Sequence, residues 1–343
     1  MPRRVLLLSL LLAAASGPAA AQAYALGVAA PLSGPSAILG EQMVAGAAAA
    51  AGTRATVVAA DTECSAEGGE VAARVFVQER VDAVIGFLCT PAIEAALPVL
   101  TQAGIPVVDV GVRANRLTNR RDRTGHLVWR LAPRSDAEAD AIAAFVRENW
   151  RTVPFGIVED GSVQARDLAD EVRARLGPES IEPALVDNYR PAEEVQFPLA
   201  RRILQSGVTR FLAFGSRQDI AILQRDAGEI GLELEIVGGE QLVDEPGETD
   251  IAAGTRALGI FDEAPEAGQR IEEGYHRPAR AATEIALGAL DAASGSSFAE
   301  AMQQATFPTV LGPISFDGKG DSSRRAFELR EWNGEAFVPV PQS

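Results

Sequence analysis

The sequence predicts an α/β protein with two lobes, each a largely parallel sheet flanked by helices. Short apolar stretches alternate with helical stretches in two series, residues 24–110 and 133–237. This alternation with short connections is typical of open parallel sheets covered by helices on both faces. Two series of this length contain more strands and helices than one modest sheet can hold, and the chain then ends in a different pattern. We therefore expect two lobes.

The first series begins at Tyr24. Its expected strands are 24–30, 56–60, 81–87 and 105–110, and its expected helices are 40–51, 67–79 and one that starts at Thr90. The stretch 81–87 is almost continuously apolar, as a strand buried on both faces must be. Thr90 followed by Pro91 predicts a helix start, with Thr90 as the N-cap and Pro91 as the first helical residue.

The second series begins near Pro133. Ser135 and Glu138 have the spacing of a capping box, which predicts a helix start there. The expected strands are 155–158, 181–186, 210–214 and 234–237, and the expected helices are 163–176, 194–206 and 218–230. Residues 257–261 are predicted to be a strand passing between the lobes, and 278–293 a helix. Strands at 326–332 and 336–340 should form an antiparallel hairpin around Asn333-Gly334.

Residues 1–21 have the pattern of a cleavable secretory signal. Arg3 and Arg4 precede a short apolar stretch, Gly17-Pro18 interrupts it, and cleavage after Ala21 or Ala23 fits the small-residue rule. We therefore expect an exported, periplasmic protein.

Export bears on Cys64 and Cys89, the only cysteines in the chain. Outside the cytoplasm two cysteines are expected to pair, so we predict a disulfide. A zinc site would need further ligands, and neither His126 nor His276 has metal-ligand spacing to the cysteines.

The composition of the chain and the absence of several motifs exclude some classes of function. The formal net charge of −16 argues against a nucleic-acid partner, which needs a positively charged surface. The G-x-S-x-G, G-x-G-x-x-G and P-loop patterns are absent from the sequence, and we expect no enzyme activity, no cofactor and no metal.

In open α/β sheets ligands bind beyond the carboxyl ends of the strands. Polar residues and glycines cluster at those ends: 33–34, Thr90, 111–113, 160–164, 215–217 and 239–240.

Several motifs of this chain resemble one known family. They are VAAPLSGPSAILGEQMVAG at 28–46, IGFLCT at 85–90, the spacing of the two cysteines, IVGGE at 236–240 and LGPISFDGKGD at 311–321. Over essentially the whole mature chain, the sequence resembles the periplasmic leucine/isoleucine/valine-binding proteins. These are the solute receptors of ABC importers and have the type I periplasmic binding fold.

The resemblance implies two lobes joined by three crossovers, with the ligand trapped as the lobes close. It places the crossovers near 131–133, near 259–261 and between 313 and 327. The implied lobes are 24–131 with 260–313 and 132–259 with 327–343, with 314–326 as a crossover segment. The implied partners are a small-molecule ligand and an ABC permease in the inner membrane, and a monomer is expected.

The resemblance also implies ligand-binding residues. Thr90 matches the hydroxyl residue that holds the ligand carboxylate, and Glu240 matches the acid that binds the ligand ammonium. Arg113 stands where the family has a threonine, in a turn with Gly111. Gln164 replaces one aromatic residue of the family, and Ser216 or Arg217 replaces another.

We expect the ligand to be an amino acid, branched-chain or more polar, or a related small carboxylate. Glu240 favours an ammonium group, and the planar guanidinium of Arg113 suits a carboxylate. Arg277 and Arg280 would add to this charge if they face the cleft, but in an arginine-rich chain they could equally be surface residues. Two alternatives remain: a sensory module of the same fold docked to a membrane receptor, and an exported α/β enzyme.

Overall fold

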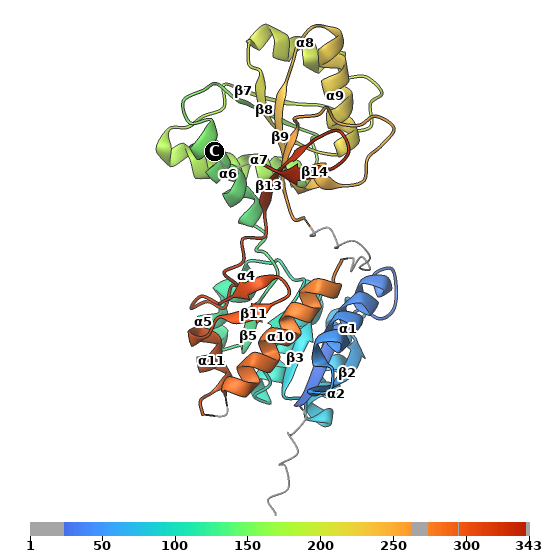
Figure 1. Ribbon diagram of the computed structural model, residues 1–343, viewed down its shortest axis with the longest axis vertical. Helices are drawn as coiled ribbons and strands as arrows, with labels where there is room; N and C mark the ends of the chain where they lie inside the picture. The colour runs from blue at the N-terminus through green and yellow to red at the C-terminus, as the bar shows by residue number, and fades with distance from the viewer. Residues whose placement is uncertain (1–23, 262–273, 294, 341–343) are drawn as a thin grey trace, which may run out of the picture.

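The computed structural model describes residues 24–261, 274–293 and 295–340. The predicted signal at 1–21 lies outside these residues. Figure 1 shows two lobes one above the other along the long axis, with a few extended segments of chain passing between them.

The first lobe contains a five-stranded parallel sheet of order β2-β1-β3-β4-β5. Its strands are β1 (Tyr24–Ala30), β2 (Ala55–Asp61), β3 (Ala83–Gly86), β4 (Val107–Asp109) and β5 (Val128–Arg130). Its early helices are α1 (Ala37–Ala51), α2 (Ala66–Glu79), α3 (Thr90–Gln102) and two single turns, α4 (Arg116–Asn119) and α5 (Arg121–Thr124). Later segments return to this lobe: α10 (His276–Ala292), α11 (Phe298–Gln304) and the hairpin β11 (Phe307–Thr309) and β12 (Gly312–Ile314).

Both faces of this sheet are buried, as the apolar stretch at 81–87 predicts. Ile85 packs in a core with α1 and α10, whereas its neighbour Val84 packs in a second core with α2 and α3. Successive side chains of a strand point to opposite faces, so a strand covered on both sides must be apolar throughout.

The second lobe contains a seven-stranded sheet of order β14-β13-β10-β9-β8-β6-β7. Its strands are β6 (Gly156–Glu159), β7 (Leu185–Asn188), β8 (Arg210–Phe214), β9 (Glu235–Gly238), β10 (Arg256–Gly259), β13 (Glu328–Trp332) and β14 (Phe337–Pro339). Its helices are α6 (Ala137–Asn149), α7 (Val163–Leu176), α8 (Phe197–Ser206) and α9 (Arg217–Glu229), with 3₁₀ turns η1 (Gly177–Glu179) and η2 (Glu240–Val243).

The strands β6 to β10 are parallel; β13 runs antiparallel beside β10, and β14 runs antiparallel beside β13 at the edge of the sheet. The predicted hairpin is confirmed: β13 pairs with β14, and the side chain of Asn333 accepts hydrogen bonds from the backbone N–H groups of Glu335 and Ala336. The strand expected to pass between the lobes is β10, and it is an integral part of this sheet.

Two helix starts differ from the sequence predictions. The capping box is wrong: α6 has Asp136 at its N-cap without a side-chain cap, and the carboxylate of Glu138 binds elsewhere. Thr90 is the first residue of α3 rather than its N-cap, a position that Cys89 occupies. For Glu138, a tertiary contact with the Glu240 backbone decides the position of the side chain.

An ion-pair network joins two of the connecting segments beside the first lobe. The guanidinium of Arg130 is fully buried, and its Nη2 lies 2.5 Å from Oδ1 of Asp321, which belongs to the segment between β12 and β13. Arg134, which follows β5, binds Oδ2 of the same carboxylate at 2.8 Å. Asp321 therefore holds both connections together.

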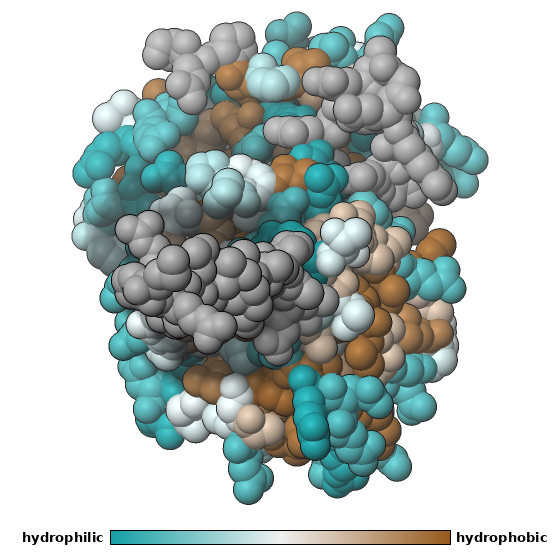
Figure 2. Space-filling view, turned by 60° about the horizontal axis from the view of Figure 1, so that its bottom comes forward, coloured by the Kyte–Doolittle hydropathy of each residue, from teal (hydrophilic) through white to brown (hydrophobic). Residues whose placement is uncertain are grey.

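The exposed surface is mixed. Large hydrophobic side chains that stay exposed include Ile38 on α1, Val71 on α2 and Val163 on α7. Figure 2 shows hydrophobic groups interspersed with hydrophilic ones on the face it presents. Among the helices of the described ranges, none combines the length and the apolar character needed to cross a membrane.

Candidate ligand-binding site

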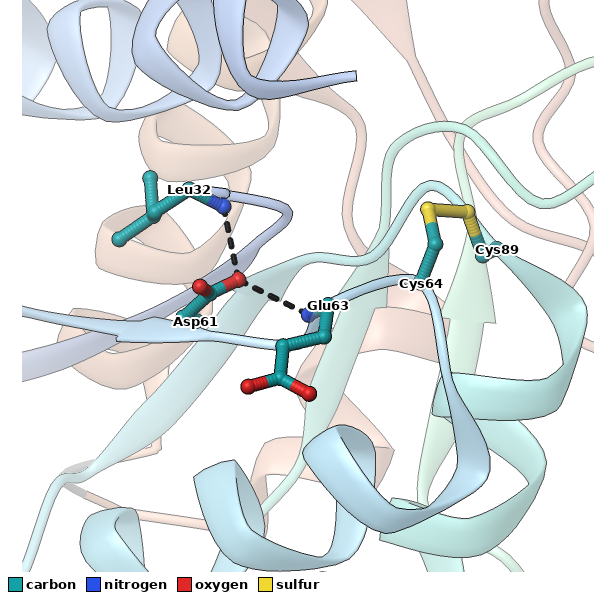
Figure 3. Close-up of a disulfide and its surroundings, with 5 residues drawn as sticks. All are labelled: Leu32, Asp61, Glu63, Cys64 and Cys89. Atoms are coloured by element: carbon teal, nitrogen blue, oxygen red, sulfur yellow. Dashed lines mark hydrogen bonds between the residues drawn. A yellow bond between two sulfur atoms is a disulfide. The ribbon is translucent and has the colours of Figure 1, made fainter. Parts of the chain in front are cut away.

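A disulfide organises the strand ends of the first lobe. Cys64, which follows β2, is bonded to Cys89, which follows β3, as predicted, and their Cα atoms are 5.1 Å apart. Figure 3 shows Asp61 beside this bridge: its carboxylate accepts hydrogen bonds of 2.8 Å from the backbone N–H groups of Leu32 and Glu63. The loops after β1, β2 and β3 are thereby tied together.

Thr90 lies next to this bridge, directly after Cys89. Gly111 lies at the end of β4. Thr90 is half-buried at the start of α3, and within the described chain its hydroxyl makes no hydrogen bond that would compete with a ligand. A Cβ at Gly111 would lie 2.9 Å from Leu88 and 3.1 Å from the ring of Tyr275. Glycine at position 111 therefore lets the Tyr275 ring approach the turn that carries Arg113.

Asp109 supports this turn from inside. Its carboxyl group is completely buried and accepts the backbone N–H of Val112 at 3.1 Å. Burial raises the pKa of Asp109 well above its usual range, although the Val112 N–H and the charge of Arg130 oppose the shift. Arg130 also donates to the carbonyl oxygens of Arg113 and Ala114, at 3.2 and 2.8 Å. The backbone of Arg113 is thus held on its inner side.

The side chain of Arg113 points to the other lobe. Its Nη1 lies 2.8 Å from Oε2 of Glu240, and each side chain is 34% exposed. Arg113 follows β4 of the first lobe, and Glu240 begins η2 after β9 of the second. The guanidinium carbon lies 5.5 Å from the ring centre of Phe327, in the segment leading to β13. Two of the three charged residues predicted to bind the ligand, Arg113 and Glu240, therefore form an ion pair with each other.

Glu138 is a third charged residue at this place, and the sequence analysis missed it as a site residue. Its Oε1 accepts the backbone N–H of Glu240 at 2.7 Å. Burial raises the pKa of Glu138, and the negative charge of Glu240 adds to the shift, while the Glu240 N–H and the charge of Arg113 oppose it. The Ser-x-x-Glu spacing fits a capping box equally well, so the sequence held no separate signal.

Gln164 lies in the same part of the second lobe. With Glu138, Gly215, Gly239 and Gln241 it lines a small hollow where β6, β8 and β9 end. A Cβ at Gly239 would lie 2.3 Å from the Glu138 carboxylate, so the close approach of that carboxylate requires glycine.

Ser216 and Arg217 make contacts within their own lobe. The Ser216 hydroxyl caps α9 by accepting the Asp219 N–H, and it donates to the Asp219 carboxylate at 2.7 Å. Arg217 is 5% exposed, lies 2.7 Å from Asp250 and stacks over Trp332 at 4.2 Å. These contacts explain why the Arg217 side chain is buried. Because its guanidinium is already engaged within the second lobe, Arg217 has the weakest support as a ligand contact among the predicted residues.

The remaining arginines make their own contacts in the first lobe. Arg277 donates to the carbonyl of Val310 at 3.1 Å, and Arg280 lies 3.3 Å from the Glu284 carboxylate, one turn along α10. The described residues contain no grouping of His, Cys, Asp and Glu side chains suited to a metal ion.

Comparisons with known proteins agree with this architecture. The family model described as periplasmic binding protein matches residues 23–336. The Leu/Ile/Val-binding protein BraC3 of Rhizobium johnstonii is 26% identical, over 98% of this chain and 99% of that protein. The leucine-, isoleucine-, valine-, threonine- and alanine-binding protein of Pseudomonas aeruginosa is 24% identical, over 92% of each.

Solved structures share the fold at low identity. A putative branched-chain amino acid ABC transporter protein from Rhodospirillum rubrum superposes with a TM-score of 0.77 at 16% identity, covering 93% of this chain and 100% of the other. An R. palustris solute-binding protein in complex with 4-hydroxybenzoate superposes with a TM-score of 0.61 at 17% sequence identity, covering 93% of this chain and 95% of the other. The two-lobed α/β fold and the resemblance predicted from the sequence are thus confirmed, and the chain belongs to the periplasmic binding protein family.

Proposed function

We propose that this protein is the periplasmic solute receptor of an ABC importer. It captures an amino acid, branched-chain or more polar, or a related small carboxylate between its two closing lobes. The observation that carries this proposal is the Arg113–Glu240 pair, in which one group from each lobe lies 2.8 Å from the other. Relatives named for leucine, isoleucine and valine binding support the ligand class, and structures with isoleucine and with 4-hydroxybenzoate support a carboxylate.

Each proposed contact has a physical basis. Arg113 offers several N–H donors in one plane, which matches the two oxygens of a carboxylate. Thr90 adds a hydroxyl donor at the start of α3, and the backbone of Gly111 is a further proposed contact in the turn that carries Arg113. Glu240 accepts an ammonium group from the side of the second lobe, with Gln164 close to the same strand ends. A ligand held from both lobes binds the closed form more tightly and so favours closure.

The other expectations stay with this proposal. The lobe boundaries are 24–131 with 260–313 and 132–259 with 327–343, joined by 314–326. The N-terminal signal directs export, the receptor acts as a monomer without enzymatic activity, and its protein partner is a permease in the inner membrane. Ser216 remains a proposed ligand contact, and Arg217 a weaker one.

A thermal-shift screen of the exported form tests the proposal. The panel contains the twenty common L-amino acids and, at the same concentrations, small organic acids that include 4-hydroxybenzoate. A ligand at 100 times its Kd adds about 2.7 kcal/mol to the free energy of unfolding, which raises the melting temperature measurably. Native mass spectrometry of the same preparation identifies any ligand retained during purification. If no compound of either class raises the melting temperature, the proposal fails.

A further inference from the structure

The charges around Arg113 are unbalanced. Two carboxylates of the second lobe, Glu240 and Glu138, lie beside one guanidinium of the first. One oxygen of Glu138 accepts the Glu240 N–H, and its second oxygen makes no hydrogen bond within the described chain. Gln164 and Gln241, which line the hollow beside Glu138, carry no charge. Arg113 alone therefore cannot balance both carboxylates when both are ionised.

The Arg113–Glu240 pair can be separated readily. Both side chains are one-third exposed, so water competes for both charges and weakens the pair. A ligand carboxylate can therefore displace Glu240 from the guanidinium. Once it has done so, Glu240 has lost its counter-charge and lies beside Glu138 in a cleft that is losing water. Two adjacent carboxylates without a cation are strongly disfavoured in such surroundings.

A ligand that brings its own cation removes this cost. We propose that Glu138 is a specificity-determining residue, and that the ligand's ammonium group binds between Glu138 and Glu240 while its carboxylate takes the place of Glu240 on Arg113. In the empty protein, Arg113 stands in for that ammonium group. This inference rests on the proposed function, and it adds a residue that the sequence analysis did not assign to the site.

A purely structural role for Glu138 predicts a different outcome. The Glu240 N–H needs only an acceptor, and the amide oxygen of glutamine supplies one at the same place. Glu138→Gln therefore preserves the support of the Glu240 loop and removes only the charge. The matched control is Glu148→Gln, which makes the same change at an exposed position on the same helix, α6.

The test compares ligands with and without an amino group. Melting temperatures and calorimetric affinities are measured for wild type and both variants with the twenty L-amino acids. The same measurements use carboxylates that lack the amino group, namely 4-methylpentanoate for leucine, propanoate for alanine and glutarate for glutamate. We expect Glu138→Gln to lower amino-acid affinity at least tenfold, to leave or improve binding of the deaminated acid, and Glu148→Gln to change neither.

The outcomes separate this inference from the proposed function. If Glu138→Gln binds amino acids as tightly as wild type, or weakens both ligand classes equally, the inference is wrong and the receptor function stands. Binding of deaminated acids alone by wild type also overturns the inference without touching the receptor function. If wild type binds no compound in either class, both proposals fail together.

Discussion

The guanidinium of Arg113 and the carboxylate of Glu240 lie 2.8 Å apart although 127 residues separate them in the chain. One follows β4 of the first sheet and the other follows β9 of the second, so their contact spans the two lobes. Each group is complementary to one end of an amino acid, which is why the proposed function places the ligand at this pair.

Replacing Arg113 tests the carboxylate contact. Hydrogen bonds to charged groups contribute about 1.5–3 kcal/mol, so Arg113→Ala should weaken binding of the best ligand from the screen roughly tenfold to a hundredfold. Isothermal titration calorimetry measures the change. Arg116→Ala is the control, since Arg116 is exposed and pairs with Glu94 on α3. Unchanged affinity in Arg113→Ala would remove this residue from the site.

Removing the disulfide should lower the free energy of unfolding. Cys64 and Cys89 are 25 residues apart, and in the chain-entropy model a loop of this size contributes about 3–4 kcal/mol. The double variant Cys64→Ser/Cys89→Ser should therefore unfold at lower urea concentration than the oxidised wild type. Reduced wild type serves as the control and should match the variant. Equal midpoints for the variant and the oxidised wild type would contradict a stabilising bridge.

Truncating Asp321 should strongly destabilise the first lobe. The change leaves the fully buried guanidinium of Arg130 without its carboxylate partner, and breaking a buried ion pair costs about 3–5 kcal/mol. Chemical denaturation of Asp321→Ala measures the loss. Asp122→Ala, at an exposed position of α5, should cost less than about 0.5 kcal/mol. A loss of that small size at Asp321 would show that Arg130 does not depend on it.

The buried carboxyl of Asp109 should make stability depend on pH. Its pKa is raised in the folded state above the ordinary value of 3.8, so the native protein keeps a proton that the unfolded chain releases. Its contribution to the free energy of unfolding is therefore fully present below pH 3.8 and is lost as pH rises toward the folded pKa. The loss has a slope of up to about 1.4 kcal/mol per pH unit.

Asp109→Asn removes this titration and keeps an acceptor for the Val112 N–H. We expect the stability of the variant relative to wild type to increase between pH 4 and pH 7, measured by urea denaturation at each pH. Other titrating groups are common to both proteins and cancel in the difference. A difference that stays constant or decreases over this range would mean that Asp109 is ionised in the folded protein.

Much of the fold was predictable because its signals are local. The apolar stretch at 81–87 identifies a strand buried on both faces, and Asn333-Gly334 identifies a hairpin turn, from neighbouring residues alone. The pairing of Cys64 with Cys89 followed from an exported chain with two cysteines. In each case the composition of a short stretch, or the number of cysteines in an exported chain, is sufficient for the prediction.

The sequence by itself determined the two-lobed α/β architecture and the disulfide, and it predicted which strand ends would carry a ligand site. Only the tertiary structure decided which side chains meet there. The spacing of Glu138 fits a helix cap, yet its carboxylate binds the Glu240 backbone because β9 ends beside α6. Arg217 has the sequence position of a ligand residue but stacks on Trp332 from the C-terminal hairpin. Such pairings depend on how distant elements pack, and no local pattern of residues encodes that geometry.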